Sequence, residues 1–543
     1  MFHSASLILG LASIPLAHGA ALYPRQTQQV TTSFGSVQGA TSNLESGVTV
    51  YKGIPFAKPP VGDLRWTAPT SPANWSGVLN ATTFGADCAQ SYSEVGLFSS
   101  GNTNISEDCL YMNIWAPANA SSTSNLPVFL WIYGGRFVGG SGSVPTYDGA
   151  HLAAKGMVVV TFNYRMGPFG FLAHPDLSAE SAHNSSGNYG ILDQQQAINF
   201  LKTEVAAFGG DADHITVGGQ SAGSASALIM MYSPLSSDNI VGCIAESGAR
   251  DPHDPETYGL ATSHRWMDLA LKQGEDFLAE MNVTTIAALR NVSMETLLKS
   301  DNSQDTILDG TVFANSTLGL VSEPPLWRPV VDGYVLPYGY GETLSKNAHN
   351  DIPIMTGDNL GESSTSNLTL TTYKTGYAAI MGNLTNDFLS AYPATSDTEA
   401  TAQNAAFGQD INRVSTWHWA SDWYAGGATS DVFVYFWTHA PPNQTSGAYH
   451  GSELWYTFGN LPTYYNYTWT ELDYELQRTM GDYWANFIKG GDPNGGNLTA
   501  FPPVRSNVTE IMWLGDAVGV DYVANSTGKI AVIEDFFAEN VEW

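Results

Sequence analysis

The sequence predicts an α/β protein in which a large, mostly parallel β-sheet is covered by helices on both faces. Continuous apolar runs rich in valine, isoleucine and aromatic residues occupy 126–138 and 157–165, as expected of strands buried on both faces. Residues 188–207 instead place their apolar side chains at helical spacing. Alternation of strands and helices implies a parallel sheet, because parallel neighbours need a crossover connection.

The other segments extend this sheet. Short strands and turns punctuated by proline and glycine predict a small N-terminal β-layer over 30–70. Further strands are predicted at 215–217, 243–247, 352–357 and 432–439. Residues 251–350 and 360–430 are polar, and we expect long helical insertions over the carboxyl edge of the sheet, with 296–323 loosely structured. No repeat or linker marks a second unit, so 20–543 is predicted to be one domain.

Composition excludes several functional classes. The chain carries 51 acidic against 21 basic residues, a formal net charge of -30, which would repel nucleic acid and anionic membranes. With 43% apolar and only 13% charged residues, it can bury a large core. A soluble, acidic, compact protein is expected.

The N-terminus predicts secretion. Residues 1–19 have the features of a signal peptide: an apolar run from Leu7 to Leu16, too short to span a bilayer, and then Ala17-His18-Gly19. Fifteen Asn-x-Ser/Thr sites between Asn74 and Asn525 agree with a glycosylated extracellular protein. No later segment predicts a membrane anchor.

The stretch 215–230, ITVGGQSAGSASALIM, predicts an exposed nucleophile. A strand end, a sharp turn over 218–223 and a helix of small residues place Ser221 where its hydroxyl projects above the sheet. Gly219 and Gly223 flank it at positions where such a turn leaves no room for a Cβ. A structural turn would explain this short motif equally well, so the interpretation depends on the rest of the chain.

Matches along nearly the whole chain resemble the type-B carboxylesterases and lipases, the cholinesterase-like branch of the α/β-hydrolases, and in particular a secreted, fungal-type member. The matching segments are YKGIPFAKPPVGDLRW at 51, EDCLYMNIW at 107, WIYGGRF at 131, FNYRMGPFGFL at 162, GNYGILDQQQA at 187, FGGDADHITVGGQSAGS at 208, PVVDGYVLP at 329 and DYWANFIKGGDPN at 482. The resemblance implies an α/β-hydrolase fold and a catalytic triad in the chain order serine, acid, histidine.

By this resemblance the triad is Ser221, Glu362 and His450. His450 stands in YHGSELWYTFG and would take the proton of the serine hydroxyl, while the carboxylate fixes the ring tautomer. Glu362 stands in TGDNLGES, where both neighbours differ from the family pattern, so Asp358 is the alternative acid. The oxyanion hole would use backbone N–H groups of Gly135, Arg136 and Ala222.

Three residues are candidates for substrate binding. Arg136 replaces a glycine of the family pattern and adds a cation beside the oxyanion hole, unless its side chain turns to solvent. Gln220 stands where many members have glutamate, and Arg250 follows on a segment that approaches the acyl pocket in the family. Inward-pointing arginines would favour acidic or polar acyl groups over long apolar chains.

Three cysteines are few for a secreted chain of this length. Guided by the EDCLYMN match, we expect a disulfide between Cys88 and Cys109, whose closed loop would stabilise the fold by about 3 kcal/mol. Cys243 lies in an apolar run and is expected to be a buried, inert thiol rather than a reactive one.

These observations predict a secreted serine carboxylesterase that acts on small-molecule esters through an acyl-enzyme, with no metal or cofactor. The segment between Cys88 and Cys109 contains no tryptophan and is short and polar, which disfavours choline esters and bulk triglyceride. Two alternatives stay open: a lipase for longer acyl esters, and a non-catalytic cholinesterase-like binding protein. The acyl group, the alcohol group and the oligomeric state cannot be predicted.

Overall fold

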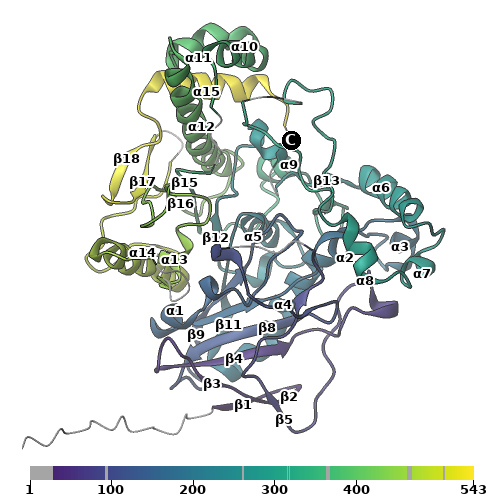
Figure 1. Cartoon of the computed structure of the whole chain (residues 1–543). Helices are drawn as coiled ribbons and strands as arrows, with labels where there is room; N and C mark the ends of the chain where they lie inside the picture. Colours follow the sequence, from purple (N-terminus) through teal and green to yellow (C-terminus); the bar gives the residue numbers. More distant parts are fainter. Residues whose placement is uncertain are drawn as a thin grey trace, which may run out of the picture.

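The computed structural model describes residues 28–91, 96–259, 262–314, 316, 318–362, 367–461, 467–505 and 508–542. Within these ranges the main sheet has eleven strands (Figure 1). In spatial order they are β18 (Gly519–Tyr522), β17 (Glu510–Leu514), β16 (Val432–Trp437), β15 (Ile354–Asn359), β12 (Gly242–Glu246), β11 (Gly210–Gln220), β9 (Leu126–Ile132), β10 (Val158–Phe162), β8 (Tyr111–Pro117), β4 (Val48–Pro55) and β3 (Ala40–Thr41). The predicted signal peptide lies outside the described residues.

In this spatial order, the seven neighbouring strands from β17 across to β10 run parallel to one another. Antiparallel pairing begins at the two sides, where β10 meets β8 and β17 meets β18. The parallel part is buried throughout: all five residues of β10 and all six of β15 are inaccessible to solvent or nearly so. This explains their continuous apolar sequences, because a parallel sheet has helices on both faces. Helices cover both faces here, as the sequence predicts.

The helices are listed here in chain order. They are α1 (Ala150–Ala154), α2 (Gly167–Phe171), α3 (Pro175–Glu180), α4 (Tyr189–Glu204), α5 (Ala222–Tyr232), α6 (Met267–Glu280), α7 (Ile286–Leu289), α8 (Met294–Leu297), α9 (Tyr340–Ser345), α10 (Leu370–Met381), α11 (Thr385–Ala391), α12 (Asp397–Ala425), α13 (Leu454–Thr457), α14 (Glu471–Gly490) and α15 (Thr527–Glu539). None of the described helices is long and apolar enough to cross a membrane.

The long insertions predicted over the sheet edge are present. The first carries α6 to α9, and the second carries α10 to α12, which Figure 1 shows extending away from the sheet beside α15. Helix α12 is 29 residues long and is capped by Ser396, whose side chain accepts a hydrogen bond from Glu399 N–H. Its inner face packs on β15 and β16, which links the insertion to the sheet.

Smaller sheets complete the fold. The N-terminal β-layer consists of β1 (Gln29–Thr32), β2 (Gly35–Gln38) and β5 (Val78–Asn80). Two short pairs are β6 (Asp87–Cys88) with β7 (Ile105–Ser106), and β13 (Arg265–Trp266) with β14 (Val330–Val331).

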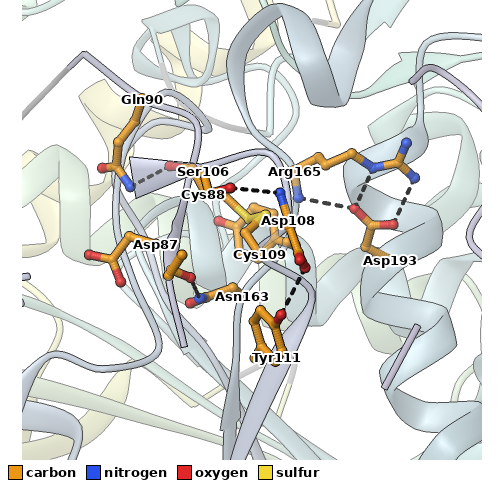
Figure 2. Close-up of a disulfide and its surroundings, with 12 residues drawn as sticks. Asp87, Cys88, Gln90, Ser106, Asp108, Cys109, Tyr111, Asn163, Arg165 and Asp193 are labelled. Atoms are coloured by element: carbon orange, nitrogen blue, oxygen red, sulfur yellow. Dashed lines mark hydrogen bonds and ion pairs between the residues drawn. A yellow bond between two sulfur atoms is a disulfide. The ribbon is translucent and has the colours of Figure 1, made fainter. Parts of the chain in front are cut away.

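The predicted disulfide joins Cys88 and Cys109, whose Cα atoms are 4.9 Å apart, and Cys243 is free and buried on β12. Figure 2 shows the bridge beside the buried ion pair of Arg165 and Asp193, where two guanidinium nitrogens each lie 2.8 Å from a carboxylate oxygen. The bridge therefore fastens the β6–β7 segment next to a charged contact between the loop after β10 and α4.

Candidate active site

Ser221 occupies the sharp turn between β11 and α5. Its backbone has φ 59° and ψ -124°, a conformation that costs about 1–3 kcal/mol outside glycine. The turn depends on its glycines, since a Cβ on Gly219 or Gly223 would collide with backbone atoms, in the second case the carbonyl oxygen of Ile132. The N–H of Ser221 donates to the carbonyl of Glu246 at 2.9 Å. The nucleophile candidate is thus held by the end of the neighbouring strand β12.

Glu362 and His450 lie in contact. Nδ1 of His450 is hydrogen bonded to one carboxylate oxygen of Glu362. The other oxygen accepts the Ser247 hydroxyl at 2.6 Å and the Asn359 N–H at 2.8 Å. The Glu362 side chain is 6% exposed, whereas the His450 ring is 38% exposed. A buried carboxylate with three hydrogen bonds therefore fixes one edge of the His450 ring, while part of the ring stays accessible to solvent.

The electrostatics of this pair agree with its geometry. Burial acts to raise the pKa of Glu362, but the ring of His450 and the Ser247 hydroxyl together leave it below its usual value. Burial acts to lower the pKa of His450, but the Glu362 carboxylate more than compensates and raises it above the ordinary value. The pair thus favours a charged carboxylate beside a basic ring.

Gln220 connects the ring to the nucleophile strand. Its side-chain amide nitrogen lies 2.9 Å from Nε2 of His450, and the residue is fully buried directly before Ser221. The same nitrogen lies 3.3 Å from Nδ1, so the Gln220 amide lies against the imidazole ring, close to both of its nitrogens.

The glycine segment after β9 lies against the turn. A Cβ on Gly134 would be 3.0 Å from Cβ of Ser221, so only glycine permits this approach. Gly135, Arg136 and Phe137 follow with φ of 108°, 57° and 61°.

Ala222 is the first residue of α5, so its N–H has no acceptor within the helix, and its nitrogen lies 3.5 Å from the position that a Cβ on Gly134 would take. Gly134 was not among the residues predicted from the sequence for the oxyanion hole.

The two candidate arginines have different surroundings. The guanidinium of Arg136 donates to the carbonyl of Glu323 at 3.0 Å, and the residue is exposed.

Arg250 is buried and 3% exposed, with guanidinium nitrogens 3.3 Å from Glu256, 3.5 Å from Asp254 and 3.7 Å from Asp358. Its charge therefore compensates buried acids. Asp358, the alternative triad acid, contacts Arg250 and Thr416, while Glu362 contacts the histidine.

A cavity of about 640 Å³ adjoins Glu362 and His450. Its wall combines leucines of two loops with polar side chains of α12 and of the loop before His450. The polar members are Asn404, Gln409, Asn412, Thr445 and Ser446. It has room for an ester substituent larger than acetyl, and its surface favours a group that can form hydrogen bonds.

Among the described residues, one cluster has atoms of the kind that bind metals close together. Atoms of Asp251, His418 and Asp422 lie within 4.8 Å of one another. The His418 ring already forms an ion pair with the buried Asp251 carboxylate, which accounts for the arrangement. The expectation of no cofactor stays a prediction.

Comparison with known proteins shows which family this chain belongs to. The carboxylesterase family model matches residues 26–525. The chain belongs to the carboxylesterase family. It is 34% identical over 527 residues to fumonisin B1 esterase of Sphingopyxis macrogoltabida, covering 95% of this chain and 91% of that protein. Identity to para-nitrobenzyl esterase of Bacillus subtilis is 32% over 487 residues, covering 86% and 91%.

Other relatives agree. Carboxylesterase 1D of Rattus norvegicus is 31% identical over 524 residues, covering 88% of each chain. A solved structure named PNB esterase superposes with a TM-score of 0.73 at 30% identity, covering 93% of this chain and 99% of that one. The carboxylesterase thus has the α/β-hydrolase fold and is a serine-dependent carboxylic ester hydrolase.

Two contacts in this carboxylesterase were not predicted. Ser247 donates to Glu362 although it lies 115 residues earlier, and it has a left-handed φ of 57° like Ser221. Asn359 bonds Glu362 through its backbone and the carbonyl of Tyr449 through its side chain. The serine at the end of the predicted strand 243–247, at the same edge as Ser221, was the available signal.

Proposed function

We propose that ester hydrolysis in this enzyme proceeds through an acyl-enzyme on Ser221. His450 takes the hydroxyl proton at Nε2 as Oγ attacks the carbonyl carbon, and then gives that proton to the leaving alcohol. Water next attacks the acyl-enzyme with His450 as base, and the proton returns to Oγ as the carboxylic acid leaves. Glu362 keeps the Nδ1 proton in place and stabilises the imidazolium. The contact of Glu362 with His450, whose ring lies on the residue before Ser221, is the observation that carries this proposal.

The developing oxyanion would be bound by N–H groups of Ala222 and of the glycine segment at Gly134, Gly135 and Arg136. Their support is the close approach of Gly134 to Ser221 and the position of Ala222 at the start of α5. Donors fixed before the reaction stabilise the transition state without reorganisation.

The proposal is tested by substitution of the three residues. Ser221→Ala should lower kcat by several orders of magnitude and abolish labelling by a fluorophosphonate probe, while the fold persists. Glu362→Gln should lower kcat about 10⁴-fold. It should also move the acid limb of the pH profile to lower pH, because the carboxylate that raises the pKa of His450 is gone. Retained turnover in folded Ser221→Ala, or a larger loss in Asp358→Asn than in Glu362→Gln, would contradict the assignment.

The preferred substrates, we propose, are soluble esters with a polar acyl group. Support comes from the polar wall of the cavity beside His450, and one relative bears the name fumonisin B1 esterase. Because the charge of Arg250 is compensated by acids, recognition of a carboxylate would depend on Arg136.

The test compares a carboxylate-bearing ester, its methyl-capped analogue and a long-chain alkyl ester in the wild type and in Arg136→Gly. If both proteins give the same ratio of kcat/KM for the first two esters, Arg136 takes no part in selection. The fastest turnover on the alkyl ester, with a jump in rate above its solubility limit, would favour a lipase.

The enzyme is further proposed to be secreted and glycosylated after removal of residues 1–19. Support comes from the apolar leader and the fifteen Asn-x-Ser/Thr sites. N-terminal sequencing of protein recovered from the medium of a eukaryotic host should begin at or near residue 20, and glycosidase treatment should lower the apparent mass. Retention of the whole chain inside the cells would contradict this.

A further inference from the structure

Behind the proposed triad, Glu246 and Glu453 form a buried pair of carboxyl groups. Glu246 ends β12, Glu453 directly precedes α13, and both side chains are inaccessible to solvent. The two carboxyl groups lie close enough for a hydrogen bond to form between them when one is protonated. Their outer oxygens accept the indole N–H of Trp484 at 2.8 Å and the side-chain N–H of Asn359. No N–H or hydroxyl of the described chain donates to Oε2 of Glu246 or Oε1 of Glu453.

This arrangement requires a proton between the two groups. A carboxylate only accepts hydrogen bonds, so two carboxyl groups can bond each other only if one carries the hydrogen. Burial raises the pKa of Glu246 to about 8, and burial together with the charge of Glu246 raises that of Glu453 well above its usual value. The titratable groups that face the pair are Glu362, the Tyr435 hydroxyl and the His450 ring. The acidic neighbour Glu362 further disfavours a second negative charge.

The pair is connected to each residue of the proposed triad. The backbone carbonyl of Glu246 accepts the N–H of Ser221, and the next residue, Ser247, donates to Glu362. Glu453 follows His450 by three residues.

Asn359 joins the loop of His450 to the sheet as well. Its side chain donates both to Glu453 and, at 2.9 Å, to the carbonyl of Tyr449. The carboxyl pair therefore closes the link between the strand that supports the nucleophile and the loop that carries the base.

We propose that Glu246 and Glu453 share one proton and thereby position His450 beside Ser221, so that loss of this proton moves the histidine loop and stops turnover. They are positioning residues, since neither touches the substrate. When hydroxide removes the shared proton, two adjacent carboxylates remain and repel each other, and the pair separates at its weaker side, the loop. This inference rests on the proposed role of His450.

The pH profile of activity tests the proposal. In the wild type, kcat should fall reversibly on the alkaline side with little change in KM. In Glu453→Gln an amide N–H replaces the shared proton and cannot be removed by hydroxide, so the alkaline limb should move up by about one pH unit or more. Glu453→Ala breaks the link, and kcat at neutral pH should fall about tenfold or more. If Glu453→Gln fails to fold, Glu246→Gln replaces it in the test, because it places an amide N–H between the same two groups.

The matched control is Glu204→Gln, which alters a buried glutamate that bonds Ser33 far from the site. It should leave the alkaline limb in place. An alkaline limb that is the same in both glutamine variants as in the wild type would overturn the proposal.

A second readout is independent of activity. The infrared band of protonated carboxyl groups at neutral pH should lose intensity in Glu453→Gln and in Glu246→Gln, but not in Glu204→Gln. An unchanged band in both glutamine variants would overturn the proposal of a shared proton, even if His450 is the catalytic base. If instead the band changes as expected while His450→Ala retains activity, the proposed function has failed and the shared proton has not.

Discussion

Ser247→Ala is the substitution that tests the local geometry most directly. It removes one oxygen atom that donates to Glu362 at 2.6 Å from a side chain only 6% exposed. Alanine adds no bulk, and the N–H of residue 247 keeps its bond to the carbonyl of Gly357 at 2.8 Å. The change therefore removes one of the three partners of the carboxylate, and leaves the Asn359 N–H and His450 in place.

A hydrogen bond to a charged group contributes about 1.5–3 kcal/mol. Since about 1.4 kcal/mol corresponds to a factor of ten in rate, kcat should fall by about 10 to 150-fold if the lost bond had held Glu362 in the position that orients His450. KM should change little, because the Ser247 side chain is buried and directed at Glu362. The pKa of Glu362 should rise when this donor is lost, so the acid limb of the profile should also lie at higher pH.

The assay is steady-state hydrolysis of a chromogenic ester between pH 5 and 9, with thermal unfolding to confirm the fold. Ser178→Ala is a suitable control, because it removes a buried serine whose partner, Ser186, lies away from the site. A Ser247→Ala enzyme with kcat within about twofold of the wild type would refute the reasoning, since the carboxylate would then need no third partner.

Other substitutions test stability and the turn at the nucleophile. Arg250→Met leaves its buried acids without their cation, and denaturant unfolding should show a loss of about 3–5 kcal/mol, with substrate preference unchanged. If substrate preference shifts and stability does not, Arg250 faces the substrate. Replacing Cys88 and Cys109 together by serine should cost about 3 kcal/mol in the same measurement, and unchanged stability would contradict this estimate. Gly223→Ala should destabilise by more than about 1 kcal/mol and lower kcat sharply, because the added methyl group meets the carbonyl of Ile132. A fully active Gly223→Ala enzyme would show that the turn can relax.

Much of the sheet could be predicted because burial on both faces leaves a local signal. The apolar runs became β9, β10, β12, β15 and β16, although β9 ends at Ile132, well before residue 138, because the glycine segment begins there. Strand β11 begins at Gly210, earlier than predicted, because its first residues are polar and partly exposed. Helix α12 was expected only as part of an insertion, since its buried side chains include Asn404, Asp410 and Arg413, which hide the apolar spacing.

The residues of the site likewise divide into those with a local sequence signal and those without one. Ser221 and His450 stand in short motifs whose glycines have a local steric purpose, and a sequence can show that. Arg250 could not be placed, because its environment is made by Asp254, Glu256 and Asp358, and nothing in a linear pattern says that these carboxyl groups converge. The shared proton of Glu246 and Glu453 escapes prediction for the same reason, as it depends on two groups 207 positions apart that meet only in the folded chain.

The dipeptide Glu246-Ser247 has a consequence for how this enzyme can change. One residue bonds the nucleophile's backbone and the loop of the base, and the next bonds the acid. Substitutions here should therefore be strongly epistatic with substitutions at Ser221, Glu362 and His450, so that double-mutant cycles deviate from additivity although no reacting atom belongs to the dipeptide. Variants selected in the laboratory for new substrates should accumulate changes in the cavity wall long before they change this pair.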